Sequence, residues 1–593
     1  MKLYNIRSKI KILTLIKLCA LYSPASFVAC FLLTVLEGLM IPFMLYTVAR
    51  FIDSAVTITS PNPDTRTILI YLGLTALGFL YSQLGQDFRQ YGYDRLEDAL
   101  RNGLKPDIIK KEYSIDFLVF EAAATQDLIL RVTEEIEAKF AGVIRSVNTA
   151  VSVTIQVFGV LYAVAVYNWW IALLYIAIMI PSIILTFRNG RVIYQEEKKV
   201  EFLTRQMNYI SDLLSSRETV HERSLFGFSG ELNQRFMSAH LYRSNFNTKL
   251  LARETSGSMM LNIVISIFTV FTIYVLSRQI ANGILSVGLF TSITGSMINL
   301  SKIVALQSSE LVLEFSRHTE YAKDFEEFMQ LKETRPEGKN YGSKISFESL
   351  EIRNLRFKYK DSKEYILKGI NISLKKGMSY SLVGLNGAGK STLVKILVGL
   401  YREYEGDILL NGIDLKLYDS VDLRCIFSVV SQDFAKYYIT FKDNITLGRP
   451  DGNMDKVMRQ LELQDLIHNL PMKEHSYLGK VYDGGIDVSG GEWQRIAIAR
   501  ALYQDSAFMI MDEPTAALSP TAESTMYSRF MNLAKDKTLL MISHRLGSTK
   551  IADEIIVLDQ GRILEQGPHE ELMQHGSVYA QLFRKQSEIY DKA

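Results

Sequence analysis

The sequence predicts a membrane α-helical domain, with six transmembrane helices that have long cytoplasmic extensions, followed by an α/β domain. Three observations predict this division. A chain of 593 residues is too long for one hydrophobic core. Its first half contains long stretches without a charged residue, and its second half alternates short β-branched runs with helical periods.

The composition excludes several other classes of protein. Although 48% of the residues are hydrophobic, the formal net charge is only +2. A charge so close to zero excludes a generally basic nucleic-acid binder, so we expect no nucleic acid among the partners. The 3 cysteines exclude a disulfide scaffold and a four-thiolate metal site.

The uncharged stretches define the helices of the first domain. A helix that crosses a bilayer needs about 20 apolar residues. Ser146–Phe187 contains no charged residue and is long enough for two spans that turn near Asn168. The first span is interrupted by Glu37. We predict a transmembrane domain at 1–320 with spans at about 23–50, 66–86, 146–167, 169–188, 257–278 and 287–310.

The flanking charges predict the orientation. The residues before the first span include five basic side chains and no acid, namely Lys2, Arg7, Lys9, Lys11 and Lys17. Basic flanks stay inside, so we expect a cytoplasmic N-terminus. The long charged connections at 87–139 and 188–254 then extend the spans as helices into the cytoplasm. The alternative is a soluble helical domain inserted twice.

A polar segment at 321–345 is the expected linker, and the α/β domain is expected at 346–593. Within it, Gly384–Ser391 has the P-loop pattern, preceded by a strand at Tyr380–Val383 and followed by a helix from Lys390. Its glycines let backbone N–H groups face phosphate oxygens, Lys390 neutralises the β and γ phosphates, and the Ser391 hydroxyl can bind Mg²⁺. The expected contacts are Gly384, Leu385, Asn386, Gly387, Ala388, Gly389, Lys390, Ser391 and Thr392.

A second apolar strand completes the expected nucleotide site. Phe508–Glu513 ends in two acids. We expect Asp512 to hold the Mg²⁺ shell through water and Glu513 to orient or deprotonate the attacking water. Together with the P-loop, this strand predicts an α/β P-loop NTPase domain.

The segment VSGGEWQ at Val488–Gln494 lies between the P-loop and this strand. It resembles the signature motif of ATP-binding cassette (ABC) proteins. The resemblance implies that this segment offers hydroxyl and backbone donors, at a helix N-terminus, to ATP bound by another chain. The residues concerned are Ser489, Gly490, Gly491 and Glu492.

Three further positions match this family in order. Tyr359 resembles the aromatic residue that stacks on adenine, and His544 resembles the switch histidine that contacts the γ-phosphate. Gln432 resembles the glutamine that contacts Mg²⁺ and senses the membrane domain. The resemblance therefore implies ATP and Mg²⁺ as cofactors, Glu513 and His544 as catalytic residues, and Ser391, Gln432 and Asp512 as metal ligands.

Six spans followed by one cassette resemble an ABC exporter half-transporter over nearly the whole chain. The resemblance implies a homodimer in the cell membrane, with cytoplasmic cassettes that close around two ATP molecules and couple hydrolysis to transport. Coupling segments are expected near Ile115–Glu121 and Leu213–Thr219. Ser519 stands where the family has Asp after Glu513, and we expect slower or less coupled hydrolysis from this change.

The cassette details look most like bacterial exporters of lantibiotics and related small peptides, so a peptide or other amphipathic substrate is expected. A lipid or glycolipid flippase, a multidrug exporter and a non-transporting regulatory ATPase are the alternatives. Glu37 within the first span is a candidate contact for a cationic substrate, with Lys302 in the sixth span as a second candidate. The alternative is a structural ion pair, for example between Glu37 and Lys302.

Overall fold

A computed structural model describes residues 11–59, 64–333, 346–359, 362–449, 452–512, 537–543, 546–574 and 577–591. The chain divides into two compact units. The helical unit comprises Met1–Ile115 and Phe120–Glu333, and the α/β unit comprises Asp116–Val119 and Thr334–Ala593.

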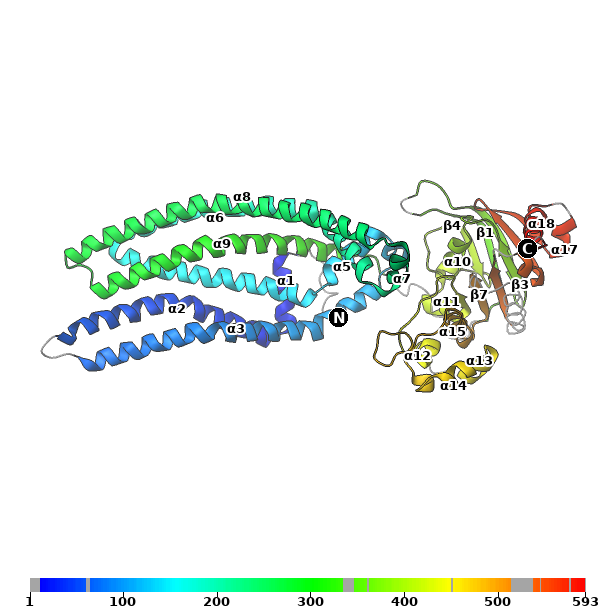
Figure 1. Cartoon of the computed structure of the whole chain (residues 1–593), viewed down its shortest axis with the longest axis horizontal. Helices are drawn as coiled ribbons and strands as arrows, with labels where there is room; N and C mark the ends of the chain where they lie inside the picture. Colours follow the sequence, from blue (N-terminus) through cyan, green and yellow to red (C-terminus); the bar gives the residue numbers. More distant parts are fainter. Residues whose placement is uncertain are drawn as a thin grey trace. The chain divides into compact units, whose positions relative to one another are not determined.

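Long helices that run side by side form the helical unit, as Figure 1 shows. The end of α2 and the start of α3 lie at the same end of this unit as the turn between α8 and α9 (Figure 1). The helices are α1 (Ile12–Tyr22), α2 (Pro24–Val56), α3 (Thr65–Tyr113), α5 (Ala123–Thr133), α6 (Ile136–Ser215), α7 (Arg217–Phe226), α8 (Ser229–Ala281) and α9 (Val287–Gln330).

Four described helical segments are long and apolar enough to cross a membrane: Pro24–Val56, Thr65–Tyr113, Ile136–Pro181 and Ile263–Ala281. The third and fourth predicted spans lie in the two helical segments of α6, which meet at a kink. The kink is at Asn168, a non-helical residue with φ −149° and ψ 86°, where the sequence predicted a turn. α9 covers the sixth predicted span.

Glycines bring α2 and α6 into close contact. A Cβ atom on Gly159 would lie 2.1 Å from Cγ of Pro42, and one on Gly38 would lie 2.8 Å from Cβ of Ile155. Small residues at such contacts are a common means of helix packing in membranes, because they let the backbones approach.

Asp53, near the end of α2, holds the start of α9. Its carboxylate accepts hydrogen bonds from Ser286 Oγ at 2.6 Å and from the backbone N–H of Gly288 at 2.8 Å. A Cβ atom on Gly288 would lie 2.1 Å from the carbonyl oxygen of Ala49, so α9 begins against the backbone of α2. A carboxylate at a helix N-terminus satisfies free N–H groups and interacts favourably with the helix dipole.

Two sheets form the framework of the α/β unit. The four-stranded antiparallel sheet has the order β2-β1-β4-β5, and the six-stranded sheet has the order β10-β9-β3-β8-β7-β6. Only β10 is antiparallel to its neighbour in the larger sheet. The strands are β1 (Ser349–Phe357), β2 (Leu367–Lys375), β3 (Ser379–Val383), β4 (Glu405–Leu410), β5 (Ile413–Asp414), β6 (Phe427–Val430), β7 (Phe508–Asp512), β8 (Thr538–Ile542), β9 (Glu554–Asp559) and β10 (Arg562–Gly567).

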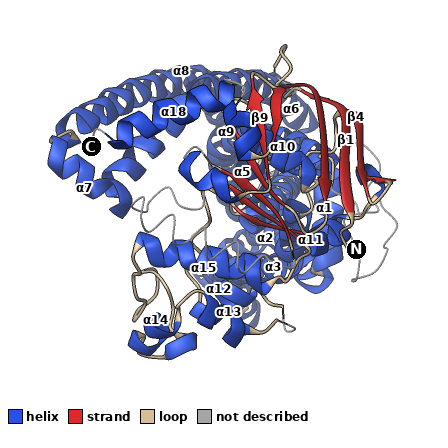
Figure 2. Ribbon diagram, turned by 90° about the vertical axis from the view of Figure 1, so that its right-hand side faces the viewer, coloured by secondary structure: helices blue, strands red, loops and turns tan. Residues whose placement is uncertain are grey.

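The helices of this unit form separate groups, and α12 to α15 lie together beside the sheets in Figure 2. This group has its own core around Phe441, Leu463 and Trp493, whose side chains are buried. The helices are α10 (Lys390–Leu397), α11 (Ser420–Ile426), α12 (Phe441–Thr446), α13 (Met454–Gln460), α14 (Gln464–Asn469), α15 (Gly490–Tyr503), α17 (His569–Gln574) and α18 (Val578–Asp591).

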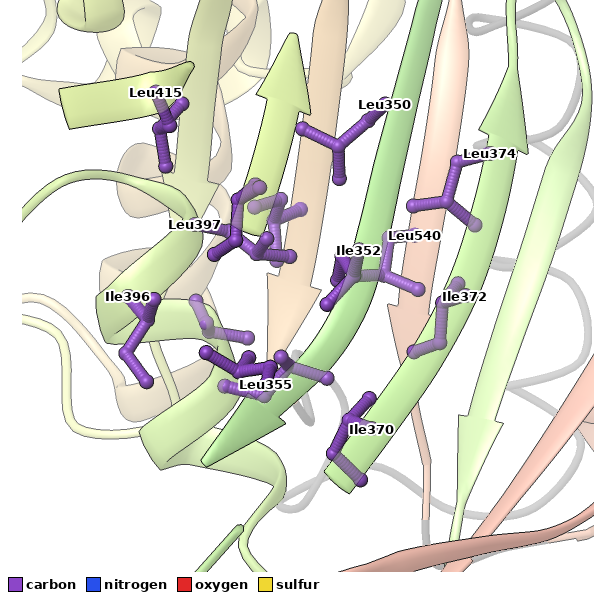
Figure 3. Packing of buried hydrophobic residues seen from close by; sticks show 14 of the residues in the cluster. Leu350, Ile352, Leu355, Ile370, Ile372, Leu374, Ile396, Leu397, Leu415 and Leu540 are labelled. Carbon is purple, nitrogen blue, oxygen red and sulfur yellow. The ribbon is translucent and has the colours of Figure 1, made fainter. Parts of the chain in front are cut away.

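The main core lies between the two sheets and includes α10. Leu350 and Ile352 of β1 belong to the same buried cluster as Ile396 of α10 and Leu540 of β8, and Figure 3 shows Leu540 beside Ile352. Burial of this apolar surface holds α10 rigidly against the strands, because each fully buried Leu or Ile contributes about 1.5–3 kcal/mol. The loop before α10 is therefore held at both of its ends.

A short helix from between α3 and α5 also belongs to the α/β unit. This helix, α4 (Phe117–Phe120), lies within the coupling segment that the sequence predicted at Ile115–Glu121. The ring of Phe117 lies 5.9 Å from that of Tyr401, and Lys395 Nζ lies 5.6 Å from the centre of the Phe117 ring. The segment packs against the main core close to α10.

Candidate nucleotide site

The P-loop, Gly384–Ser391, connects β3 to α10, and its backbone geometry requires glycine. Gly387 and Gly389 have φ angles of +80° and +105°, which L side chains rarely adopt. A Cβ atom on Gly384 would lie 2.0 Å from the carbonyl oxygen of Leu558. The loop therefore turns tightly into the N-terminus of α10, where backbone N–H groups favour phosphate.

Lys390 is the first residue of α10 and is almost completely buried. Its Nζ donates hydrogen bonds to the carbonyl oxygens of Gly384 at 2.9 Å and Leu385 at 3.1 Å. The ammonium group is thus held against the loop that would surround a phosphate. The hydroxyl of Ser391, the next residue, is on an exposed side chain.

The strand order brings the other expected ligands to the same edge of the sheet. β3, β8, β7 and β6 are parallel and adjacent, so their carboxyl ends lie side by side. Asp512 ends β7 with 9% of its surface exposed, and Gln432 follows β6 with an exposed side chain. Both therefore lie at the sheet edge from which the P-loop emerges.

These residues fit a bound Mg²⁺. Ser391, Gln432 and Asp512 supply hydroxyl, amide and carboxylate oxygens, the donors that this ion prefers. Within the described residues, no group of three His, Cys, Asp or Glu side chains could hold a metal ion. Magnesium in nucleotide sites is usually bound by one or two protein side chains together with phosphate oxygens and water.

Tyr359, the expected adenine contact, lies beside the P-loop helix. Its hydroxyl is 3.0 Å from Thr392 Oγ1, and its ring is perpendicular to that of Tyr401 at 5.9 Å. The ring of Phe357 lies 5.3 Å away. The structure thus places Tyr359 and Thr392 together, as the expected nucleotide contacts require.

The signature segment, Ser489–Glu492, caps helix α15. Ser489 Oγ accepts a hydrogen bond from the backbone N–H of Glu492 at 3.3 Å. In return, one carboxylate oxygen of Glu492 accepts hydrogen bonds from the N–H of Ser489 at 2.7 Å and from its hydroxyl at 2.8 Å. This reciprocal capping box fixes the start of the helix.

Sequence reasoning missed Arg500 on α15. Its Nε and Nη2 donate hydrogen bonds to the backbone oxygen and side-chain Oδ1 of Asn444, at 2.9 and 2.6 Å. Nη1 donates to the carbonyl oxygen of Ala435 at 2.6 Å, and the guanidinium lies over the Tyr437 ring. Burial lowers the pKa of this guanidinium. Its spacing along the helix gives no signal of these contacts, which tie the signature helix to the segment that follows Gln432.

Three expected site residues lie outside the described part of the chain, namely Glu513, Ser519 and His544. In the helical unit, the structure pairs Glu37 with Arg89 of α3, not with Lys302. Lys302 lies on α9 with an exposed side chain. Glu37 therefore forms an ion pair, as the alternative to a substrate contact expected, but its partner is Arg89, which the sequence analysis did not identify.

Comparisons with known proteins agree with this geometry. Residues 27–303 match the ABC transporter transmembrane region, and residues 367–516 match the ABC transporter family. Over 558 residues the chain is 30% identical to the subtilin transport ATP-binding protein SpaT of Bacillus subtilis, covering 93% of this chain and 90% of that protein. Over 540 residues it is 28% identical to the ATP-dependent lipid A-core flippase of Hahella chejuensis, and the match covers 89% of this chain and 90% of that protein.

A further relative is the nisin transport ATP-binding protein NisT of Lactococcus lactis subsp. lactis, 26% identical over 528 residues, with coverage of 87% of this chain and 86% of that protein. Among solved structures, a bacterial Atm1-family ABC exporter with ATP bound matches with a TM-score of 0.74 and 22% identity. The match covers 95% of this chain and 98% of that one, and it shows the shared fold.

Fold and site together define a multi-pass membrane protein with an ATPase domain that binds ATP and couples its hydrolysis to transport. The chain belongs to the ABC transporter family and is an exporter half-transporter, a transmembrane domain fused to one ATPase domain. Exporters of this kind function as dimers. The predicted fold class and family are confirmed.

Proposed function

We propose that this protein exports a small lantibiotic-like peptide across the cytoplasmic membrane by ATP-driven alternating access. The observation that carries this proposal is the 30% identity to SpaT over 93% of the chain, since SpaT is a subtilin transport protein. The similarity to NisT, a nisin transport protein, supports the same class of cargo.

The working unit in this proposal is a homodimer, with both N-termini and both ATPase domains in the cytoplasm. Each chain carries a P-loop and a signature segment, and the signature segment of one copy completes the site on the other. The P-loop backbone and Lys390 bind the phosphates, and Tyr359 binds the adenine. The Ser489 hydroxyl of the second copy donates to the far side of the triphosphate.

Ser391, Gln432 and Asp512 would hold Mg²⁺, which supplies charge neutralisation at the phosphates when bound. Glu513 orients the attacking water and accepts its proton, and His544 donates a hydrogen bond to the γ-phosphate. Closure of the two ATPase domains then favours one of two membrane-domain states, and hydrolysis restores the other. Gln432 and the Phe117 segment transmit the change.

The test is transport into inside-out membrane vesicles. Labelled subtilin-type and nisin-type precursor peptides are offered outside, with ATP or with none. We expect ATP-dependent uptake by the wild type, and a loss of about a hundredfold or more in Glu513→Gln, because removal of a general base costs at least this much. No peptide uptake at all would reject peptide export, and uptake that continues in Glu513→Gln would reject transport driven by ATP hydrolysis at this residue.

A lipid flippase is the second candidate, because the chain is also 28% identical to an ATP-dependent lipid A-core flippase over 89% of its length. In liposomes, ATPase stimulation by glycolipids but not by precursor peptides would favour this function. Stimulation by peptides alone would favour export of peptides.

A further inference from the structure

A polar cavity of about 260 Å³ lies between α2, α3 and α6 of the helical unit. Every residue that lines it except Val153 has a polar side chain, and all of them are described residues. The nucleotide chemistry takes place in the other unit and makes no use of this cavity. Because a charge within a span, such as that of Glu37, is costly, the polar groups gathered around it indicate a functional site.

The acid in this cavity is already balanced. Glu37 of α2 is the only acid among the lining residues, and it forms an ion pair with Arg89 of α3. Ser152 Oγ on α6 donates a hydrogen bond to the same carboxylate at 3.2 Å, and Gln156 Nε2 donates to Ser152 Oγ at 3.0 Å. With its charge neutralised by Arg89, Glu37 attracts a second cation only weakly. Its role is to position Arg89.

Arg145 of α6 is the unbalanced charge. Its guanidinium carbon lies 5.0 Å from the centre of the Tyr93 ring. Asn148 Nδ2 donates a hydrogen bond to the Tyr93 hydroxyl at 3.1 Å. Within the described residues, Arg145 forms no ion pair, and its side chain is exposed to the cavity. Counting Glu37, Arg89 and Arg145, the cavity carries one net positive charge, surrounded by hydroxyl and amide groups.

Arg89 and Arg145 lie at a matching depth. At a rise of 1.5 Å per residue, each is about 35 Å along its helix from one end of the bundle. For Arg89 this end is the start of α3 at Thr65, and for Arg145 it is the kink at Asn168. The hydrocarbon core is about 30 Å thick, so both arginines lie at its opposite boundary. In the proposed orientation this is the cytoplasmic boundary, where cargo enters.

We propose that this polar cavity binds an anionic oxygen group, a carboxylate or a phosphate, on the transported molecule. Arg145 supplies the charge-assisted hydrogen bonds, and its planar guanidinium matches either group. Arg89, positioned by Glu37, provides the second donor. The inference rests on the proposed export function, since a cargo must reach the cavity from the cytoplasm.

The experiment uses the full-length protein in phosphatidylcholine nanodiscs. The probe is a fluorescent amphipathic peptide without acidic side chains, made with a C-terminal carboxylate or with a C-terminal amide. The variants are Arg145→Gln, Arg145→Lys and the matched control Arg95→Gln. Arg95 of α3 also lies over a tyrosine, at 5.3 Å from the Tyr91 ring, but it does not line the cavity.

We expect the wild type to bind the carboxylate form about tenfold more tightly than the amide form, the effect of one charge-assisted hydrogen bond. Arg145→Gln removes this preference, Arg145→Lys retains part of it, and Arg95→Gln leaves it unchanged. In a second arm, phosphatidylglycerol is added to the nanodiscs. If it displaces either peptide form in the wild type but not in Arg145→Gln, a lipid phosphate occupies the same site.

Equal binding of the two peptide forms, with no Arg145-dependent effect of phosphatidylglycerol, would overturn the proposal. A preference for the carboxylate that survives in Arg145→Gln would also overturn it. The vesicle assay separates this failure from that of the proposed function. If the vesicles take up peptide but the protein binds both peptide forms equally, export stands and the anion site is rejected. If the protein prefers the carboxylate form but the vesicles take up no peptide, the anion site stands and peptide export is rejected.

Discussion

Glu492 and Ser489 are coupled through the capping box at the start of α15. The hydroxyl of Ser489 donates to the Glu492 carboxylate, so it must leave this acceptor before it can donate to a phosphate. The carboxylate also places a negative charge at the point where, in our proposal, the triphosphate binds. Glu492 therefore opposes ATP binding while it stabilises the helix.

We expect Glu492→Gln to lower the KM for ATP by a few-fold with little change in kcat, because an amide still accepts the cap hydrogen bond but carries no charge. Glu492→Ala should instead lower the thermal stability, by about 1 kcal/mol for a lost cap. Steady-state ATPase assays and thermal unfolding measure the two effects. The control is Glu474→Gln, a carboxylate whose side chain is 38% exposed. An unchanged or higher KM in Glu492→Gln would contradict this view.

At the scale of secondary-structure elements, Arg500 ties the signature helix to α12 and to the segment after Gln432. We expect Arg500→Ala to lower the free energy of unfolding by about 3 kcal/mol, because it removes several hydrogen bonds from one charged group. It should also weaken the stimulation of ATPase activity by substrate. Arg495→Ala on the same helix is the control, since Arg495 donates a hydrogen bond to the Glu462 carbonyl oxygen but makes none of the contacts of Arg500. Equal effects of the two substitutions would argue against this role.

The contact between α2 and α6 depends on the absence of a side chain at Gly159. Alanine is favoured over glycine inside a helix by about 1 kcal/mol, so Gly→Ala at a helix position with free space should stabilise or be neutral. At Gly159 the new Cβ would meet Pro42 Cγ at 2.1 Å, and we expect a net destabilisation of about 1–3 kcal/mol. Thermal unfolding in nanodiscs compares Gly159→Ala with Gly73→Ala, where no atom lies within 4 Å of the added Cβ. Equal melting temperatures would show that α2 moves aside.

The environment of His318 on α9 leads us to expect that the stability of the contact between α9 and α6 depends on pH. Its Nε2 lies 3.0 Å from Ser146 Oγ, and it is 7% exposed. Burial lowers its pKa below the usual 6.5, a change that Arg317 reinforces and that Glu314 and the hydrogen bond at Gly142 partly oppose. The folded protein therefore resists a proton that the unfolded chain accepts. The stabilising effect is complete above pH 6.5 and is lost as the pH falls below that value.

We expect the melting temperature of the wild type to fall between pH 7 and pH 5.5, and His318→Gln to lose part of this fall. His221→Gln changes an exposed histidine on α7 and should leave the pH profile unchanged. Parallel pH profiles for the wild type and His318→Gln would mean that other groups control the dependence.

For the whole molecule, the sequence predicted best what depends on local chemistry. The P-loop was predictable because its glycines, Lys390 and Ser391 must follow one another along the chain to surround a phosphate. The strand order that brings Gln432 and Asp512 to the same sheet edge agrees with the resemblance to the family. The capping box has a recognisable sequence pattern, a Ser followed three residues later by a Glu, so it could also have been predicted.

Contacts between distant elements were not predictable in the same way. The cost of a charge within a span indicated that Glu37 needs a partner, but the identity of Arg89 depends on how α2 and α3 rotate about their axes. The break between the third and fourth spans was predictable from the length of the uncharged stretch, and the kink at Asn168 lies where the turn was expected. The contacts of Arg500 depend on how α15 packs on α12, and the sequence of neither helix alone predicts this packing.

The Asp53 carboxylate, which caps α9 from the end of α2, has a consequence for gating. At this end of the bundle the two helices must either swing out as one body or first separate two hydrogen bonds and a tight backbone contact. With the cytoplasmic N-terminus that we propose, this end faces the far side of the bilayer, and we expect one carboxylate, at a position that never meets the nucleotide, to help govern how easily cargo is released there.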